Sequence, residues 1–291
     1  MSPALHAAPL KAIYDVAAPA KLNLFLHITG RRPDGYHLLQ SAFMLIDWCD
    51  TLHFELRRDG QITRSDLGTP EQALLAEDLV VRAARALQAA SGTALGVHIG
   101  LEKKIPSQAG MGGGSSDAAS CLLALQRLWG VKLPAARLQA LALGLGADVP
   151  FFLGGGHAWV EGIGEQITPL ALPAARFVVV KSPAGLPTDA IFRSPQLKRD
   201  TETATIQGFA ANSEGPFGFG HNDLQPVAQT LCPQVGQSLD WLSMQQLEGR
   251  MTGSGSAVFA HLPHEMDLAV APGDWQVRKC SSLEAHPLAG W

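Results

Sequence analysis

The chain has 291 residues, enough for two domains, and its 46% hydrophobic and 16% charged residues are typical of a folded globular protein rather than a disordered one. A formal net charge of −4 without a cluster of lysines or arginines argues against nucleic-acid binding, and no apolar run approaches the roughly 18 residues that a membrane-spanning helix needs. The N-terminus lacks the features of a secretory signal or transit peptide, and four widely spaced cysteines predict neither a zinc site nor disulfides, so we expect a cytoplasmic protein.

The first predicted element is a β-strand over residues 18–28, where side chains alternate with period two. One face carries Leu22, Leu24, Leu26 and Ile28, and the other carries Lys21, Asn23, Phe25 and His27. From spacing alone, a polar edge that faces solvent is the more ordinary interpretation of the second face. A lysine and an asparagine two residues apart can also point together into a cleft.

A turn over residues 29–37 follows, marked by Pro-Asp-Gly, and it places Tyr36 beside His37. An aromatic ring next to a hydrogen-bonding ring suits a flat heterocycle, but a loop tyrosine that packs on its own domain is equally ordinary. The next expected elements are apolar strands over 38–48 and 51–56, a polar loop over 57–70, a helix over 74–90 and a strand over 96–101.

Residues 105–129 form the most informative stretch, because four glycines within five positions lead through two serines and an aspartate into a helix over 116–129. Glycine allows φ > 0 and close approach of a ligand, and a helix N-terminus presents free N–H groups and the positive end of its dipole. We therefore expect a phosphate-binding loop, although many glycine-rich turns before helices bind nothing. It is no Walker A loop, because no Gly-Lys-Ser/Thr closes it, and a dinucleotide fingerprint would need glycine at Ser115.

Beyond a helix over 134–143, Asp148 stands between a glycine turn and an apolar run, where it either caps the next turn or acts on a ligand proton. Strands are expected at 157–161, 176–181 and up to 259, helical segments at 188–193, from 221 and over 235–247, and a mobile loop over 198–220. A Pro- and Ala-rich stretch from 169 marks a subdomain junction.

Several motifs, in the same order along residues 17–260, resemble the GHMP kinases, named for galactokinase, homoserine kinase, mevalonate kinase and phosphomevalonate kinase. They are APAKLNL (18–24), RPDGYHL (32–38), PSQAGMGGGSS (106–116), GADVPF (146–151) and TGSG (252–255). The resemblance implies an α+β, two-domain GHMP kinase fold. Residues 1–165 would form a nucleotide-binding domain like ribosomal S5 domain 2, and residues 166–291 a ferredoxin-like α/β-plait domain.

Within this family, the motifs are most similar to the branch that uses ATP to phosphorylate the 2-hydroxyl of 4-diphosphocytidyl-2-C-methyl-D-erythritol, a step of non-mevalonate isoprenoid precursor synthesis. The resemblance implies that Asp148 is the general base and that Lys21 holds it ionised and stabilises the developing alkoxide. The residues implied at the substrate are Asn23, Tyr36, His37, Thr188, Phe192, Gly253 and Ser254, with Tyr36 and Phe192 on the two faces of the cytosine and His37 at its polar edge.

The same resemblance places ATP at Lys103, Pro106, Ser107, Gln108, Ala109, Gly110, Met111, Gly112, Gly113, Gly114, Ser115 and Ser116. Mg²⁺ is expected with ATP, and Ser116 is the one ligand that we can name. The expected partner is a small molecule with a cytidine diphosphate moiety, bound by a monomer or weak homodimer, with no nucleic acid and no membrane. One departure concerns the adenine pocket, where the family usually has Asp-Asn-Leu and this chain has Glu77-Asp-Leu79, since Asp78 cannot supply N–H donors.

Two alternatives remain at this point. A GHMP kinase for another small alcohol would not need the Tyr36-His37 pair. A non-catalytic nucleotide-binding protein on the same fold would be expected to lack Lys21 or Asp148, and both are present.

Overall fold

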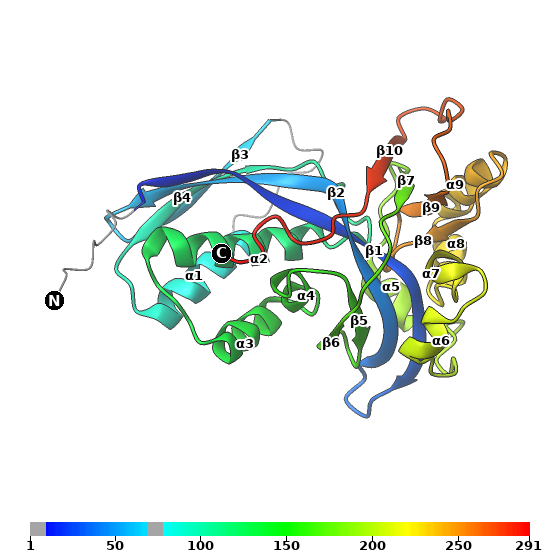
Figure 1. Ribbon diagram of the computed structural model, residues 1–291, viewed down its shortest axis with the longest axis horizontal. Coiled ribbons are helices and arrows are strands. Elements are labelled where there is room, and N and C mark those ends of the chain that lie inside the picture. Colours follow the sequence, from blue (N-terminus) through cyan, green and yellow to red (C-terminus); the bar gives the residue numbers. More distant parts are fainter. Residues whose placement is uncertain (1–9, 69–77) are drawn as a thin grey trace.

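The computed structural model describes residues 10–68 and 78–291, and these residues form two β-sheets, each covered by helices (Figure 1). The first sheet has the order β3-β4-β2-β5-β6, with β1 paired to β2. Its strands are β1 (Ala12–Arg31), β2 (His37–Arg57), β3 (Ile62–Leu67), β4 (Gly96–Glu102), β5 (Ala158–Glu161) and β6 (Gln166–Pro169). All pairs are antiparallel except β3 and β4. The predicted mixture of α and β structure is confirmed.

Four helices lie along one face of the first sheet: α1 (Leu79–Ser91), α2 (Gly113–Trp129), α3 (Ala135–Leu145) and α4 (Val149–Leu153). Helix α2 is the central one, and it packs against α1, α4, β1 and β2. Its side chains Ala118, Leu122 and Leu125 are fully buried, because apolar residues recur on more than one side of the helix. This packing fixes the position of the N-terminus of α2, whose first residues, 113–115, are themselves partly or fully exposed.

The second sheet is antiparallel, with the order β10-β7-β9-β8. Its strands are β7 (Arg176–Lys181), β8 (Gly249–Met251), β9 (Val258–Leu262) and β10 (Gln276–Ser281). The accompanying helices are α5 (Thr188–Arg193), α6 (Ile206–Ala210), α7 (Gly215–Gly218), α8 (Gln225–Leu231) and α9 (Pro233–Ser243). After β10 the chain returns to the first sheet, where Leu283 N–H donates to the Leu45 carbonyl at 3.0 Å (Figure 1).

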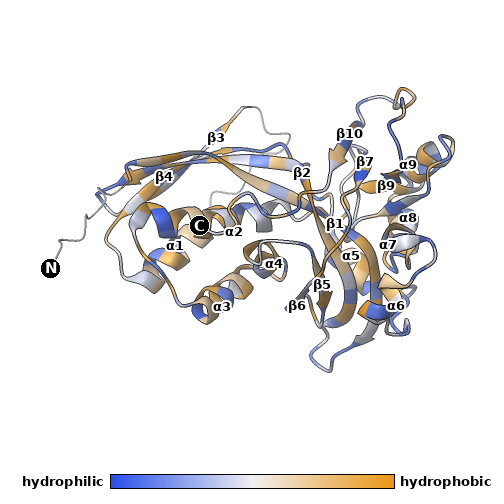
Figure 2. Cartoon of the chain, in the orientation of Figure 1, coloured by the Kyte–Doolittle hydropathy of each residue, from blue (hydrophilic) through white to orange (hydrophobic). Residues whose placement is uncertain are grey.

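The strand over 18–28 is part of the longer β1, and its polar face is buried rather than exposed to solvent. Lys21, Asn23 and His27 are only 3%, 1% and 6% exposed, so the interpretation as a solvent-facing edge is wrong. The reason is long-range. The long strands β1 and β2 of the first sheet continue until they lie beside the second sheet, and both are apolar over much of their length (Figures 1 and 2).

The predicted alternation along β1 also fails after Asn23, because the pairing with β2 shifts register there. Asn23 is opposite Phe43, but the next paired residue is Leu26, which is opposite Ser41. Such a β-bulge turns consecutive side chains to the same side. Leu24 and Phe25 accordingly pack into one core, although strict alternation predicts opposite faces.

Other predictions differ in identifiable ways. The strands expected at 38–48 and 51–56 are one strand, β2, whose irregular pairing with β1 near Cys49 replaces the expected break. The expected loop over 57–70 contains β3, a polar edge strand without the apolar alternation that sequence patterns detect. The helix over 74–90 is confirmed from Leu79 onward, and residues 74–77 lie outside the described part. The loop over 198–220 contains α6 and α7, and its Phe209 is buried against Trp159.

Contact between the glycine loop and the turn that joins β8 to β9 leaves no room for a side chain at Gly110. This glycine has φ = +72°, and a Cβ atom there would lie 2.2 Å from the carbonyl oxygen of Thr252. Gly130 also has a positive φ, +63°, but a Cβ there would meet nothing within 4 Å.

We expect Gly110→Ala to lower the free energy of unfolding clearly more than Gly130→Ala. Both alanines carry the cost of a left-handed backbone, about 1–2 kcal/mol, and only the first adds a backbone clash. Urea unfolding of both variants measures the difference. Equal losses would show that the loop does not depend on close contact with the β8–β9 turn.

Candidate active site

A cavity of about 1000 Å³ opens where β1, the glycine loop, the start of α4, α5 and the β8–β9 turn meet. Most of the predicted site residues line it: Lys21, Asn23, Lys103, residues 106–115, Asp148, Thr188, Phe192, Gly253 and Ser254. Tyr36, His37 and Ser116 do not. Tyr36 is 60% exposed, whereas the ring of His37 lies 5.0 Å from that of Phe192 and so adjoins the cavity.

The glycine loop presents a helix N-terminus to this cavity. Helix α2 begins at Gly113, and Gly112, its N-cap residue, has φ = +72° and no side chain to cap the helix. The first N–H groups of a helix have no partner within it, and the helix dipole is positive there. This arrangement, open to the cavity, fits the predicted anion-binding loop.

The loop is held on both sides by backbone hydrogen bonds. Lys21 N–H on β1 donates to the Met111 carbonyl at 3.0 Å. From the β8–β9 turn, Ala257 N–H donates to the Ala109 carbonyl at 3.2 Å. Both sheets therefore contribute to the shape of the loop.

Lys21 and Asp148 come together although they lie 127 positions apart in the sequence. Lys21 Nζ lies 3.7 Å from Asp148 Oδ2, with side-chain exposures of 4% and 31%. Asp148 directly precedes α4, but its side chain makes no capping hydrogen bond, so the interpretation as a simple cap is wrong. Burial lowers the pKa of Lys21, and the charge of Asp148 partly counteracts this effect. A buried cation thus stands beside a carboxylate that can still reach a ligand.

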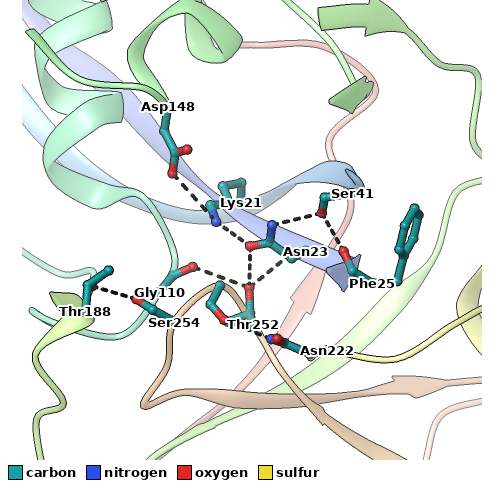
Figure 3. Close-up of polar contacts among 11 residues, drawn as sticks. Lys21, Asn23, Phe25, Ser41, Gly110, Asp148, Thr188, Asn222, Thr252 and Ser254 are labelled. Atoms are coloured by element: carbon teal, nitrogen blue, oxygen red, sulfur yellow. Dashed lines mark hydrogen bonds and ion pairs between the residues drawn. The ribbon is translucent and has the colours of Figure 1, made fainter. Parts of the chain in front are cut away.

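Asn23 connects this pair to the second sheet (Figure 3). Its Oδ1 accepts a hydrogen bond from Lys21 Nζ, and its Nδ2 donates to Ser41 Oγ at 2.9 Å. Its backbone N–H donates to Thr252 Oγ1 at 3.0 Å. Thr252 is fully buried, and it was not among the predicted site residues although it opens the TGSG motif. Nearby, Thr188 and Ser254 share a hydrogen bond of 2.7 Å between their hydroxyls.

Lys103 contacts two buried carboxylates that sequence reasoning missed. Its Nζ bonds to Asp117 Oδ2 at 2.7 Å and to Asp50 Oδ2. Burial lowers the pKa of Lys103, but the charges of Asp117 and Asp50 together outweigh it and raise that pKa. Burial also raises the pKa of Asp117 well above its ordinary value, against the effect of Lys103. The cluster ties β2 to the first turn of α2, directly behind the glycine loop.

Asp50 has a second function in this cluster. Its Oδ1 accepts the N–H groups of Lys104 and Ile105, at 2.5 and 2.8 Å, so it also orients the segment that enters the glycine loop. The only sequence signal was an acidic residue within an apolar strand, at the point where a break was expected.

Asp78, at the position where the family usually has asparagine, caps helix α1. Its Oδ1 accepts from Val81 N–H at 3.0 Å, and its Oδ2 lies 2.8 Å from a nitrogen of Arg64. It also lines the cavity. Its neighbour Glu77 lies outside the described residues.

The described residues lack two features, a metal-binding cluster and a membrane-spanning helix. Among residues 10–68 and 78–291, no three or more His, Cys, Asp or Glu side chains gather as a metal site. In the same part of the chain, no helix combines the length and apolar character needed to cross a membrane.

Comparison with known proteins gives a consistent result. Residues 78–156 match the family model described as GHMP kinases N terminal domain. The chain is 79% identical to 4-diphosphocytidyl-2-C-methyl-D-erythritol kinase from Polaromonas sp. strain JS666, over 98% of this chain and 96% of that protein. It is also similar to a crystal structure of 4-(cytidine 5'-diphospho)-2C-methyl-D-erythritol kinase, with a TM-score of 0.70, 33% identity, and coverage of 91% of this chain and 98% of that one.

The homoserine kinase of Cytophaga hutchinsonii shares the fold, with a TM-score of 0.68 at 15% identity, over 97% of this chain and 98% of that one. The predicted two-domain α+β GHMP kinase fold is confirmed.

We expect Lys103→Met to destabilise the protein by about 3–5 kcal/mol, because it leaves two carboxylates buried without their cation. Lys104→Met is the matched control, since Lys104 is adjacent, exposed, and pairs with the half-buried Glu102. The loss of unfolding free energy in Lys104→Met should be much smaller, because water screens the pair of Lys104 and Glu102. Chemical unfolding at neutral pH measures both. Equal losses would contradict a structural role for the Lys103 cluster.

Proposed function

Because this chain belongs to the GHMP kinases and, among them, to the 4-diphosphocytidyl-2-C-methyl-D-erythritol kinases, which are small-molecule kinases, we propose that it transfers the γ-phosphoryl group of ATP to the 2-hydroxyl of 4-diphosphocytidyl-2-C-methyl-D-erythritol. The observation that carries this proposal is the Lys21–Asp148 pair, 3.7 Å apart, on the wall of the cavity that also contains the glycine loop. An acid–base pair beside an anion site is the arrangement that phosphoryl transfer to an alcohol requires.

On the donor side, the glycine loop and the N-terminus of α2 bind the ATP phosphates. Backbone N–H groups there are fixed by the packing of α2, so they need little reorganisation when the anion binds. Lys103 lies against the loop, but it is engaged by two carboxylates. Its contribution is therefore to position the loop as well as to add positive charge near the phosphates.

On the acceptor side, Asp148 accepts the proton of the 2-hydroxyl. The hydroxyl oxygen then bonds to the γ-phosphorus, and the bond from that phosphorus to the β–γ bridging oxygen breaks, so that ADP leaves with the electron pair. Lys21, buried and fixed by Asn23, stabilises the negative charge on the attacking oxygen. Charge placed in a dry site acts more strongly than it would in water.

Mg²⁺ is expected to accompany ATP, since it binds phosphate and carboxylate oxygens. The residues present fit such an ion. In the described part of the chain, Ser116 Oγ and Asp117 Oδ1 are buried oxygens without a hydrogen-bond partner; of the two residues, Asp117 lines the cavity and Ser116 lies behind its wall. These two would hold the ion, which would neutralise phosphate charge.

The cytidine moiety would lie at the other end of the cavity, near Phe192, His37 and the exposed Tyr36. A monomer or weak homodimer remains our proposal for the oligomeric state. We keep the domain boundary between residues 165 and 166 as a proposal. Two segments after this boundary still contact the first sheet: β6, which pairs with β5, and Ser282, which forms a bridge with Ile46. Four unpaired cysteines suit a reducing cytoplasm.

The proposal is tested by turnover of the purified chain with ATP and Mg²⁺ in an assay coupled to ADP release. We expect turnover of 4-diphosphocytidyl-2-C-methyl-D-erythritol. We expect no comparable turnover of homoserine or mevalonate, because neither has a nucleobase to stack on Phe192. A folded protein that phosphorylates one of these instead would establish the rival GHMP kinase. No turnover of any alcohol would favour a non-catalytic nucleotide-binding protein.

Asp148→Asn should lower kcat by about 10²–10⁴-fold, because the amide cannot accept the proton. ATP affinity should change little, since the phosphate loop is intact. Calorimetric titration with ATP and steady-state kinetics measure the two effects. The control is Asp274→Asn, an exposed aspartate outside the cavity, which should retain full activity. Unchanged kcat in Asp148→Asn would refute the assigned base.

A further inference from the structure

Arg199, in the segment between α5 and α6, links the two rings at the cytidine end of the cavity. Its Nε donates to His37 Nε2 at 3.0 Å. One terminal nitrogen donates to the carbonyl of Phe192 at 3.0 Å and to that of Ser194 at 2.8 Å. The other donates to the Leu197 carbonyl at 2.9 Å. One side chain thus connects the start of β2 with the C-terminal end of α5.

The chemistry of this contact determines the protonation of the His37 ring. A guanidinium group has only donors and keeps its protons at physiological pH. His37 Nε2 must therefore accept, and it cannot carry a hydrogen. In a neutral imidazole the other nitrogen then carries it, so His37 has hydrogen on Nδ1. Within residues 10–68 and 78–291, no hydrogen bond involves this Nδ1.

We propose that Arg199 is a positioning residue for pyrimidine recognition: it holds His37 as the Nδ1–H tautomer, so that the ring donates a hydrogen bond to an acceptor of the cytosine edge, N3 or O2. This inference rests on the proposed function, because it assigns a role at the cytidine end of the same site. The polar edge of cytosine offers both acceptors and one amino donor, so the tautomer of His37 decides which of them it can bind.

The position of Arg199 supports this role. The carbonyl groups at the C-terminal end of a helix lack partners within the helix, and Arg199 satisfies two there, at Phe192 and Ser194. The rings of His37 and Phe192 lie 5.0 Å apart at 36°. The guanidinium group therefore positions both the ring of His37, which donates the hydrogen bond, and the ring of Phe192, which stacks on the base.

Burial and the local charges favour a neutral His37 ring. Burial lowers the pKa of His37, and the nearby charges of Arg199 and Arg31 lower it further. Neutral His37 keeps Nε2 available to Arg199, and a protonated ring would face two guanidinium groups.

The tautomer can be measured directly by NMR of histidine labelled with ¹⁵N, on the full chain without ligand and with His37→Asn to assign the signal. We expect the wild type to show Nδ1 protonated and Nε2 unprotonated. Arg199→Met should shift His37 toward the Nε2–H tautomer and raise its pKa, because it removes the donor and its charge. Arg193→Met is the control: Arg193 is exposed and pairs with Asp189, so His37 should be unchanged. A wild-type His37 with hydrogen on Nε2 overturns the inference, whatever the variant does.

Binding then connects the tautomer to recognition. We expect Arg199→Met to weaken CDP binding roughly tenfold, the effect of one lost hydrogen bond, with ATP affinity unchanged. KM for the cytidine substrate should rise while kcat stays within about twofold. If the wild type binds CDP measurably and Arg199→Met binds it equally well, the inference about Arg199 is overturned and the proposed function is not. Absence of CDP binding to the wild type contradicts the proposed function instead, and the NMR result then stands by itself.

Discussion

The buried ammonium of Lys21 is the constraint around which the site is built. A cation removed from water is costly unless charges and hydrogen bonds compensate it. Here Asp148 lies 3.7 Å away, Asn23 accepts from the ammonium, and the ring of Phe43 faces it at 4.7 Å. The same groups that make the buried charge tolerable also fix it against the carboxylate. Stability and chemistry therefore place the same demands on the fold at this point.

The β-bulge in β1 connects this charge to the second sheet. Because the pairing of β1 with β2 is interrupted after Asn23, the N–H of Asn23 is available to Thr252 on the β8–β9 turn. The same turn contacts Gly110 so closely that neither Gly110 nor Gly253 has space for a Cβ atom. A strand irregularity and two glycines thus bring the glycine loop, Lys21 and the second sheet into direct contact.

Sequence reasoning succeeded where the signal was local and failed where it depended on distant partners. The glycine loop, the helix after it and the helical turn at Thr188 were predictable, because each is set by neighbouring residues. The burial of Lys21 and Asn23 was not, since it arises from the course of β1 between two sheets. Asp50 and Arg199 carried no motif: their partners, Lys103 and His37, lie 53 and 162 positions away. The assignment of Lys21 and Asp148 came from the family resemblance, and spacing alone could not pair them.

The adenine end of the site shows how such a long-range partner changes the meaning of a substitution. Aspartate in place of the family's asparagine at position 78 loses two N–H donors, which on its own would only weaken a purine contact. In this chain its carboxylate caps α1 through Val81 and pairs with Arg64, whose side chain is itself largely buried. A carboxylate at a helix N-terminus is favoured by the helix dipole, and its charge is balanced by the guanidinium. At this position the side chain therefore contributes to the wall of the cavity and to the start of α1, a role that depends on Arg64 and could not be recognised from the local sequence.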